Sequence, residues 1–416
     1  MPLSLVCGAE CQIHSNGSGA AADSHWSNLG GTVTVVSSPV RSGSFAYSLA
    51  STGADYGTLI HTAAAAAGVA YARFYFRMAD VTPTAELPIM RFQVFGTGQL
   101  EVVVTTSGVL RLVDGSGMVY SSTNDLTLAV DTWYGVEVEY DNTSGAKWRV
   151  WDGDWSSSES LVQPGSACDE VMIGVVSPTI VHTVYMDDIA IGFGTTAGEL
   201  YDDTGTNGRS SHVEILRPTS DGTHSFTTGD FKYDSSGGSD ISPSATDVYS
   251  HLDAADMEQT SEGVYASSGA ETSDYVEVHF GDLAGKPLAV SIVRHMDAQS
   301  TGTIASVSDD GSNWAGLASA SIATNQYLQE VLASAPSGAS WSTALVNGMR
   351  AQLKSSATVS DEYYGVALEV EIEDAANIYA RPISDVATTG WSTTPLWSKV
   401  DDDPDSPDGT VVSASV

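Results

Sequence analysis

Basic side chains are scarce in this sequence. Its 416 residues contain 16 Lys and Arg against 52 Asp and Glu, a formal net charge of −36, and only five of the cations are lysines. Binding a phosphate backbone requires clustered Lys and Arg, so we expect no nucleic-acid partner, and an anionic membrane surface is disfavoured for the same reason. Such acidity is typical of a secreted or particle-bound protein kept soluble by its charge.

Cysteines and long apolar runs are also few. Three cysteines, Cys7, Cys11 and Cys168, make no disulfide framework, so Cys7 and Cys11 either pair with each other or stay reduced. A zinc site is disfavoured because no second Cys/His pair with suitable spacing follows. No run approaches the roughly 20 apolar residues of a membrane span, which predicts no membrane insertion. Residues 1–6 lack the basic start of a signal peptide, so ordinary secretion is not indicated.

The common catalytic patterns are missing as well. The sequence has no Glu-x-Asp-x-x-Glu strand of the kind that sandwich glucanases use to place two carboxylates across a sugar. It also has no Gly-x-Ser-x-Gly elbow and no phosphate-binding loop. Acids do alternate at Glu137 and Glu139 and again at 369–373, and this period of two predicts the solvent face of a strand. We therefore expect no enzyme activity.

What the sequence does contain is a β pattern. Short runs rich in Val, Thr, Tyr and Phe alternate with clusters of Gly, Ser, Asp and Asn, which predicts an all-β fold. The clearest strands are expected at 71–77, 100–104, 109–113, 133–140, 147–151, 213–217, 274–280, 288–294 and 364–372. Helical periodicity is scarce, and its best candidate is 343–354.

Several of these strands are expected to be joined by tight turns. Thr105–Gly108 and Asp141–Gly145 supply residues that tolerate the backbone of a hairpin turn. Asp152–Asp154 and Asp309–Asn313 resemble acidic Ca²⁺ loops only superficially, because neither completes the twelve-residue pattern with its terminal Glu. Turn formation explains them more simply.

Composition shifts divide the chain. We expect a first β-sandwich at 1–195, a linker at 196–212, a second β-sandwich at 213–375 and a short β tail at 376–416. The tail restates the opening of the second sandwich, since Arg381-Pro-Ile-Ser-Asp385 repeats Arg217-Pro-Thr-Ser-Asp221 and then runs out.

The first 195 residues resemble a concanavalin A-like or LamG-type jelly roll. The matching features are 39–47 near the start, the strand that begins Thr132-Trp-Tyr-Gly, and a closing Val184–Ile191. Many lectins, glucanases and phage surface proteins use this sandwich. The resemblance implies two jelly-roll-like sandwiches and says little about function.

The same resemblance implies a metal site. Related carbohydrate-binding sandwiches place an early Glu, here Glu10, beside a late Asp-Asp pair, here Asp187 and Asp188, where one structural Ca²⁺ clamps the domain ends. This sequence has Ala9 where an aromatic is common. The alternative is that Asp187 or Asp188 only accepts backbone hydrogen bonds at a strand end.

Tryptophans cluster around the strand 147–151. Flat aromatic faces stack on pyranose rings, and Trp151 and Trp155 share a parity that predicts a glycan-binding platform. Core packing is the better expectation for Trp148.

Residues 208–375 look like a module that recurs in tailed-bacteriophage virion proteins. The features are the Arg-Pro opening, the acidic passage before Tyr275-Val276 and the later Ser340-Trp turn. A virion surface is therefore the expected location. In the tail, Arg381, Asp385 and Trp391 match the front of this module and are candidates for assembly by strand addition to a neighbouring subunit or to the particle. The alternatives are a disordered terminus or a lead into further sequence.

The sequence thus predicts a non-enzymatic structural protein of a tailed-phage virion, a head decoration, fibre or tail surface component, with host surface glycans as a candidate ligand. Other virion proteins are expected partners, and a homo-oligomer is expected, with a trimer favoured. Two alternatives stay open: a soluble, Ca²⁺-stabilised carbohydrate-binding protein, and a polysaccharide-degrading enzyme whose acids converge only in three dimensions.

Overall fold

The computed structural model describes most of the first 374 residues. The described ranges are 3–13, 26–94, 96–115, 124–153, 156, 159–161, 165–194, 211–233, 238–253, 257, 263–267, 270, 272–297, 305–317 and 326–355 with 361–374. The chain divides into two units, at residues 1–373 and 374–416. The predicted assembly residues Arg381, Asp385 and Trp391 lie outside the described residues, as does Trp155.

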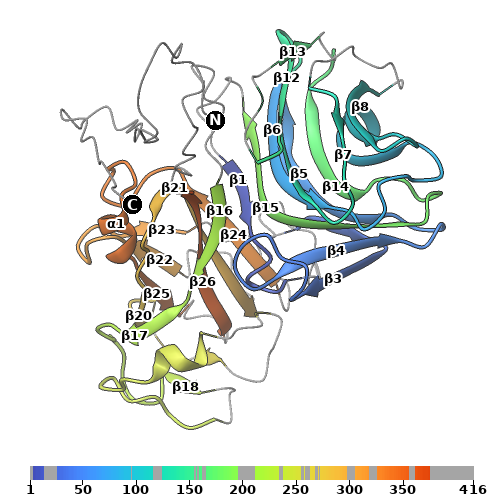
Figure 1. The fold of residues 1–416 in the computed structure, drawn as a ribbon. Coiled ribbons are helices and arrows are strands. Elements are labelled where there is room, and N and C mark those ends of the chain that lie inside the picture. The colour runs from blue at the N-terminus through green and yellow to red at the C-terminus, as the bar shows by residue number, and fades with distance from the viewer. Residues whose placement is uncertain are drawn as a thin grey trace, which may run out of the picture. The chain divides into compact units, whose positions relative to one another are not determined.

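Two sheets make up the first sandwich, drawn in blue to green in Figure 1. Sheet A has the order β13-β12-β11-β6-β15-β4-β3, with β1 paired to β15. Its strands are β1 (Leu3–Cys7), β3 (Thr32–Val36), β4 (Ala46–Ser51), β6 (Val69–Arg77), β11 (Trp133–Asp141), β12 (Gly145–Trp151), β13 (Glu159–Leu161) and β15 (His182–Gly194). Sheet C has the order β10-β9-β8-β7-β14-β5-β2. Its strands are β2 (Asn28–Gly30), β5 (Gly57–Ala67), β7 (Leu87–Val94), β8 (Thr97–Val104), β9 (Val109–Asp114), β10 (Leu126–Thr127) and β14 (Cys168–Val175).

Two further sheets make up the second sandwich. Sheet B has the order β18-β19-β26-β21-β24, with β16 paired to β26. Its strands are β16 (Ser211–Leu216), β18 (Phe231–Tyr233), β19 (Val264–Ala266), β21 (Lys286–Asp297), β24 (Gln326–Leu332) and β26 (Asp361–Glu373). Sheet D has the order β17-β20-β25-β22-β23. Its strands are β17 (Pro218–Asp221), β20 (Tyr275–Phe280), β22 (Ala305–Ser308), β23 (Ala315–Gly316) and β25 (Arg350–Lys354); the short helices are η1 (Val248–His251) and α1 (Thr343–Asn347).

Strand alternation builds a separate core inside each sandwich. On β6, Phe74 and Phe76 point between sheets A and C, and on β12 Trp148 does the same, which confirms its expected core role. In the second sandwich Val276 and Val278 of β20 pack into the equivalent core between sheets B and D. Successive strand residues point to opposite faces, so the residues between these apolar positions lie on the outer faces of the sheets.

The expected all-β fold is confirmed, since each predicted strand coincides with a strand of the structure. The predicted helix at 343–354 is wrong over most of its length. Ser342 accepts a hydrogen bond from the N–H of Leu345 and begins α1, but Gly348 ends it after one turn. Arg350–Lys354 then alternates as β25, because pairing with β20 and β22 buries its apolar residues in the second core.

The predicted turns are also confirmed. Gly108 donates its N–H to the carbonyl of Thr105, and the carboxylate of Asp141 accepts hydrogen bonds from the N–H groups of Thr143 and Ser144. In the loop 309–313, Asp310 Oδ1 accepts hydrogen bonds from Ser312 and Asn313, and these bonds lower its pKa to about 2. The turns at 141–145 and 309–313 are therefore closed by their own backbone donors.

The outer face of sheet A packs against the outer face of sheet B. One apolar cluster joins Val6, Tyr71 and Ala190 of sheet A to Val213 and Ala289 of sheet B. A second cluster places Cys11 and Ile13 of the N-terminal segment on sheet B with Met257, Val293, Tyr327 and Ala367. Residues of the segment 3–13 thus contact the second sandwich.

This packing overturns one expectation from the sequence. Glu137, Glu139, Glu369 and Glu371 were predicted to face solvent, and each is at most 3% exposed. The alternation itself is correct. The prediction is wrong about exposure because the outer faces of sheets A and B meet other protein surface instead of water.

The three cysteines, Cys7, Cys11 and Cys168, are buried and free of disulfides. No helix among the described residues is long and apolar enough to cross a membrane.

Candidate binding site

The outer face of sheet A carries two neighbouring rows of side chains. Strand pairing aligns Trp151 of β12, Gly135 of β11, Tyr75 of β6 and Asp187 of β15 in one row. We call Trp151 and Tyr75 the aromatic pair. Because Gly135 has no side chain, the two rings that flank it meet above the sheet.

The aromatic pair has an edge-to-face geometry. The ring centroids of Tyr75 and Trp151 lie 5.6 Å apart with an interplanar angle of 79°, within the range that favours such pairs. Tyr75 is fully buried, whereas Trp151 is half-buried. Burial raises the pKa of the Tyr75 phenol to about 12, so this ring is neutral at physiological pH.

A cation completes the aromatic pair. The guanidinium carbon of Arg41 lies 3.5 Å from the centroid of Tyr75 and 5.7 Å from that of Trp151. Arg41 Nη1 is 2.5 Å from Asp188 Oδ2 and donates a hydrogen bond to the carbonyl of Ser211. These contacts hold Arg41 over the Tyr75 face and near the Trp151 ring, because cations are attracted to aromatic faces.

The second row is made of charges. Pairing aligns Arg149, Glu137 and Arg73 on adjacent strands. The carboxylate of Glu137 accepts hydrogen bonds from Arg149 Nε and from the Tyr71 hydroxyl, and Arg73 Nη1 lies 3.5 Å away. A buried carboxylate is stable only when it is paired and hydrogen-bonded, and Glu137 meets both conditions.

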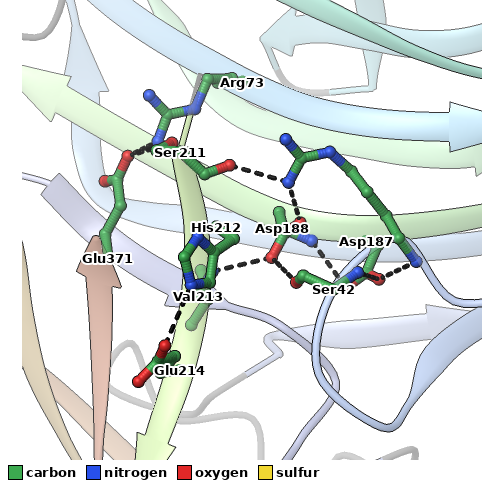
Figure 2. Close-up of polar contacts among 10 residues, drawn as sticks. Ser42, Arg73, Asp187, Asp188, Ser211, His212, Val213, Glu214 and Glu371 are labelled. Atoms are coloured by element: carbon green, nitrogen blue, oxygen red, sulfur yellow. Dashed lines mark hydrogen bonds and ion pairs between the residues drawn. The ribbon is translucent and has the colours of Figure 1, made fainter. Parts of the chain in front are cut away.

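This charged row continues into the second sandwich. Arg73 Nη2 forms an ion pair with Glu371 of β26, whose carboxylate also accepts a hydrogen bond from the Ser211 hydroxyl at 2.9 Å. Figure 2 shows Glu371 and Arg73 pointing toward one another from their separate sheets. The charges of sheet A are thus compensated by residues that sheet B supplies.

The predicted metal residues are brought together around the loop 41–45. Asp187 Oδ2 accepts hydrogen bonds from the N–H groups of Arg41 and Ser42. Asp188 Oδ1 accepts hydrogen bonds from the Ser42 hydroxyl and from the N–H of Val213, both at 2.8 Å, as Figure 2 shows. Glu10 Oε1 accepts hydrogen bonds from the N–H groups of Ser44 and Phe45.

Burial and mutual repulsion disturb the ionisation of these carboxyls. Burial is the main cause that raises the pKa of Asp187, and the charge of Asp188 raises it further. Burial also raises the pKa of Glu10, although the N–H groups of Phe45 and Ser44 act in the opposite direction.

The donors around these carboxylates do not resemble a calcium shell. Calcium takes six to eight oxygen ligands, whereas Asp187 and Asp188 face N–H groups, a hydroxyl and the Arg41 guanidinium. No group of three or more His, Cys, Asp or Glu residues in the described part of the chain is arranged to hold a metal ion. This geometry fits the alternative of hydrogen bonding at a strand end, and the calcium clamp stays a prediction.

Sequence reasoning found Trp151 but missed its surroundings. The sequence did not mark Tyr75 or Arg41 as binding residues. Tyr75 lies in an ordinary alternating strand and Arg41 in a Pro-Val-Arg-Ser turn, and both patterns are common in sandwiches. The usable signal was Gly135, which interrupts the bulky strand 133–140 at the position where two rings meet.

Comparison with known proteins gives no family assignment. No family model and no curated protein matches the sequence. Among solved structures, the cellulose-induced protein Cip1 matches at 15% identity over 45% of this chain and 95% of that chain, with a TM-score of 0.33. A conserved carbohydrate esterase, vb_24B_21 from the Shiga toxin-encoding bacteriophage phi24B, matches at 16% identity over 46% of this chain and 99% of that chain, with a TM-score of 0.31.

A third similar structure is domain 4 of AbnA, a GH43 extracellular arabinanase from Geobacillus stearothermophilus, in complex with arabinotriose. It matches at 15% identity over 47% of this chain and 94% of that chain, with a TM-score of 0.32. All three are named for a connection with carbohydrate. At these TM-scores the similarities carry no argument about what this chain does.

Proposed function

We propose that this protein is a non-enzymatic, glycan-binding component of the surface of a tailed-phage virion. The observation that supports glycan binding is the aromatic pair on sheet A. Trp151 is half-buried with its ring edge-to-face on Tyr75. A fixed aromatic ring offers a flat apolar face to a pyranose at low entropic cost, and the exposed Asp152 and Gly153 that follow it supply polar groups beside that face.

The neighbouring charges support binding over turnover. Glycoside hydrolysis needs one carboxyl group that gives a proton and a second that acts as base or nucleophile. Glu137 is held by Arg149 and Arg73, and Glu371 is held by Arg73 and Ser211. Carboxylates paired in this way are unsuited to proton transfer, which favours a binding role for this face.

Trp151 provides the direct test. We expect Trp151→Ala to weaken binding to the best neutral glycan of an array by about thirtyfold, because truncating a central Trp contact costs about 2 kcal/mol. Tyr56→Ala removes an exposed aromatic ring elsewhere and serves as the control. Equal affinities for the Trp151 variant and the unaltered protein would refute a glycan site at the aromatic pair.

The virion location and the oligomer rest on the sequence resemblance of residues 208–375 and on the repeated Arg-Pro-x-Ser-Asp motif. In the first copy of that motif Arg217 donates a hydrogen bond to the carbonyl of Glu10, and Asp221 accepts hydrogen bonds from Val248 and Tyr249 of η1. The motif therefore joins one module to the preceding one. We propose the same joining role for the copy at 381–385.

Solution mass tests this assembly role. The full chain is compared by light scattering with a chain that ends at Asp374. We expect an oligomer, with a trimer favoured, for the full chain and a monomer for the shorter one. Two monomers of the expected masses would count against self-assembly through the tail.

A further inference from the structure

The outer face of sheet D carries a second polar cluster, separate from the aromatic pair. Its strands place eight residues on this face, because their alternating neighbours fill the core of the second sandwich. They are Tyr275, Glu277 and His279 of β20, Arg350, Gln352 and Lys354 of β25, and Ser306 and Ser308 of β22. We call them the sheet D face.

Positive groups outnumber negative ones on the sheet D face. Its only acid is Glu277, whereas Arg350 and Lys354 are cations and His279 can become one. This balance is the reverse of the whole chain, in which 52 acids face 16 Lys and Arg. A local excess of cations in so acidic a protein creates a field that attracts anions.

Gln352 and His279 hold the carboxylate of Glu277 in place, and this carboxylate makes no hydrogen bond to Arg350. Its side chain is 6% exposed; Gln352 Nε2 donates to Oε2 at 3.1 Å, and His279 Nε2 lies 3.3 Å from Oε1. Arg350 Nη1 is 3.6 Å from the same Oε1, which is longer than a hydrogen bond. Glu277 thus attracts Arg350 by its charge without a hydrogen bond to Nη1.

Asp309 and Asp310 follow Ser308, which is paired with Arg350 on the neighbouring strand, and both have hydrogen-bond partners of their own. Gly311 approaches the guanidinium closely, since a Cβ there would lie 2.5 Å from Arg350 Nη1. The adjacent Asp309 accepts hydrogen bonds from the N–H and hydroxyl of Ser337, and Asp310 binds the backbone of Ser312 and Asn313. Both carboxylates thus have hydrogen-bond partners other than Arg350, whose buried Nε has none.

Part of the sheet D face is accessible, whereas Glu277, Gln352, Ser306 and Ser308 are buried. The side chain of Arg350 is 32% exposed and that of His279 is 36% exposed, and the two are directly opposite one another on adjacent strands. An Arg fork with a neighbouring imidazole matches the two oxygens of a carboxylate. Tyr275, half-buried on the same strand, adds an aromatic ring along the same face.

We propose that Arg350 and His279 form a binding site for the carboxylate of an acidic sugar residue. The site is on the second sandwich and is independent of Trp151, so it extends glycan recognition from neutral rings at the aromatic pair to acidic residues at sheet D. Sulfated sugars present similar oxygens, and the experiment separates the two.

The experiment measures the affinity of the full chain for sialyllactose, sulfated lactose and lactose by calorimetry. We expect sialyllactose to bind most tightly, and Arg350→Gln to weaken it by about tenfold to a hundredfold, the worth of one charge-assisted bond. Arg111→Gln is the matched control, because Arg111 is 33% exposed and also faces a single carboxylate, Asp125, at 3.2 Å.

Glu277→Gln provides a second, opposite test. It keeps the shape of the side chain and removes the one carboxylate that pairs with Arg350 among the described residues, so we expect tighter sialyllactose binding. This variant also guards against misreading an Arg350→Gln protein that fails to fold. Unchanged or weaker binding by Glu277→Gln, or no preference for sialyllactose over lactose, would overturn the site.

Different results would refute the glycan site at the aromatic pair and the carboxylate site on sheet D. Loss of lactose binding in Trp151→Ala with sialyllactose binding dependent on Arg350 supports both. Sialyllactose binding that depends on Arg350, without any Trp151-dependent binding, supports the sheet D site and refutes the aromatic pair. Tighter binding of sulfated lactose than of sialyllactose would replace the carboxylate by a sulfate as the ligand.

Discussion

The outer faces of sheet A and sheet D begin from the same sequence pattern and end in different states. Both alternate apolar residues with polar or charged ones, but Glu137 is aligned between Arg149 and Arg73 on neighbouring strands, whereas Glu277 is aligned with Gln352 and lies near Arg350. On sheet A, Glu137 and Arg73 are almost completely buried and Arg73 finds a second acid, Glu371, from the other sandwich. On sheet D, Arg350 has only Glu277 at 3.6 Å and stays a third exposed.

The two rows differ in how their charges can be balanced. A covered row must balance its charges internally, because an unpaired buried charge costs several kcal/mol. An open row can keep an imbalance, because water screens it. The buried charged row of sheet A therefore joins the two sandwiches, whereas Arg350 and His279 of sheet D, each about a third exposed, are the residues we propose to bind a ligand.

The largest effect should come from breaking the covered row. We expect Arg73→Met to lower the free energy of unfolding by about 3–5 kcal/mol, because it leaves Glu137 without one cation and Glu371 without its only ion-pair partner among the described residues. Arg350→Gln, on the open face, should cost less than about 1 kcal/mol. Urea unfolding of both variants measures the contrast, and similar losses would remove the distinction between the two faces.

The sequence predicted the strands more successfully than the faces. Alternation placed β6, β11, β12, β20 and β26, because a period of two is local. It predicted solvent exposure for Glu137 and Glu371 and was wrong, because which sheet face meets another sandwich depends on contacts between residues far apart in the sequence, such as Arg73 and Glu371. No local pattern records that a face will be covered.

The candidate sites show the same limit. Trp151 could be selected from the sequence as a ring on a strand, but the contribution of Tyr75 required the register of three strands. Arg350 was predicted to lie in a helix, so nothing in the sequence indicated that it would be opposite His279 on a neighbouring strand. The resemblance named Glu10, Asp187 and Asp188 as a metal site, which stays a prediction, and it gave no indication that Arg41 pairs with Asp188.

A smaller effect concerns Glu10, at the margin of the covered face. Burial raises the pKa of Glu10, so the folded state binds this proton more tightly than the unfolded state does, and stability falls as the pH rises through the window between the two pKa values. Glu10→Gln can still accept the N–H bonds of Ser44 and Phe45 without the charge. We expect it to be at least as stable as the unaltered protein at pH 7.

The pH dependence checks this sign. Thermal unfolding from pH 7 down to pH 4 should show the advantage of Glu10→Gln shrinking as Glu10 becomes protonated in the folded protein. An advantage that grows on acidification would mean that Glu10 is stabilised as a carboxylate, as a bound cation would require.

The smallest effect is expected from removing Ca²⁺, which should not change the Tm. If Arg41 and the N–H groups supply all the positive charge near Asp187 and Asp188, EGTA should leave the Tm of the full chain unchanged, and added Ca²⁺ should not raise it. A ligand that binds the folded state alone raises stability in proportion to the logarithm of its concentration, so titrating Ca²⁺ would reveal even a weak site. A rise in Tm that Glu10→Gln abolishes would indicate a bound metal ion at this carboxylate. The negative charges of Glu10, Asp187 and Asp188 would then be balanced by that ion as well as by Arg41.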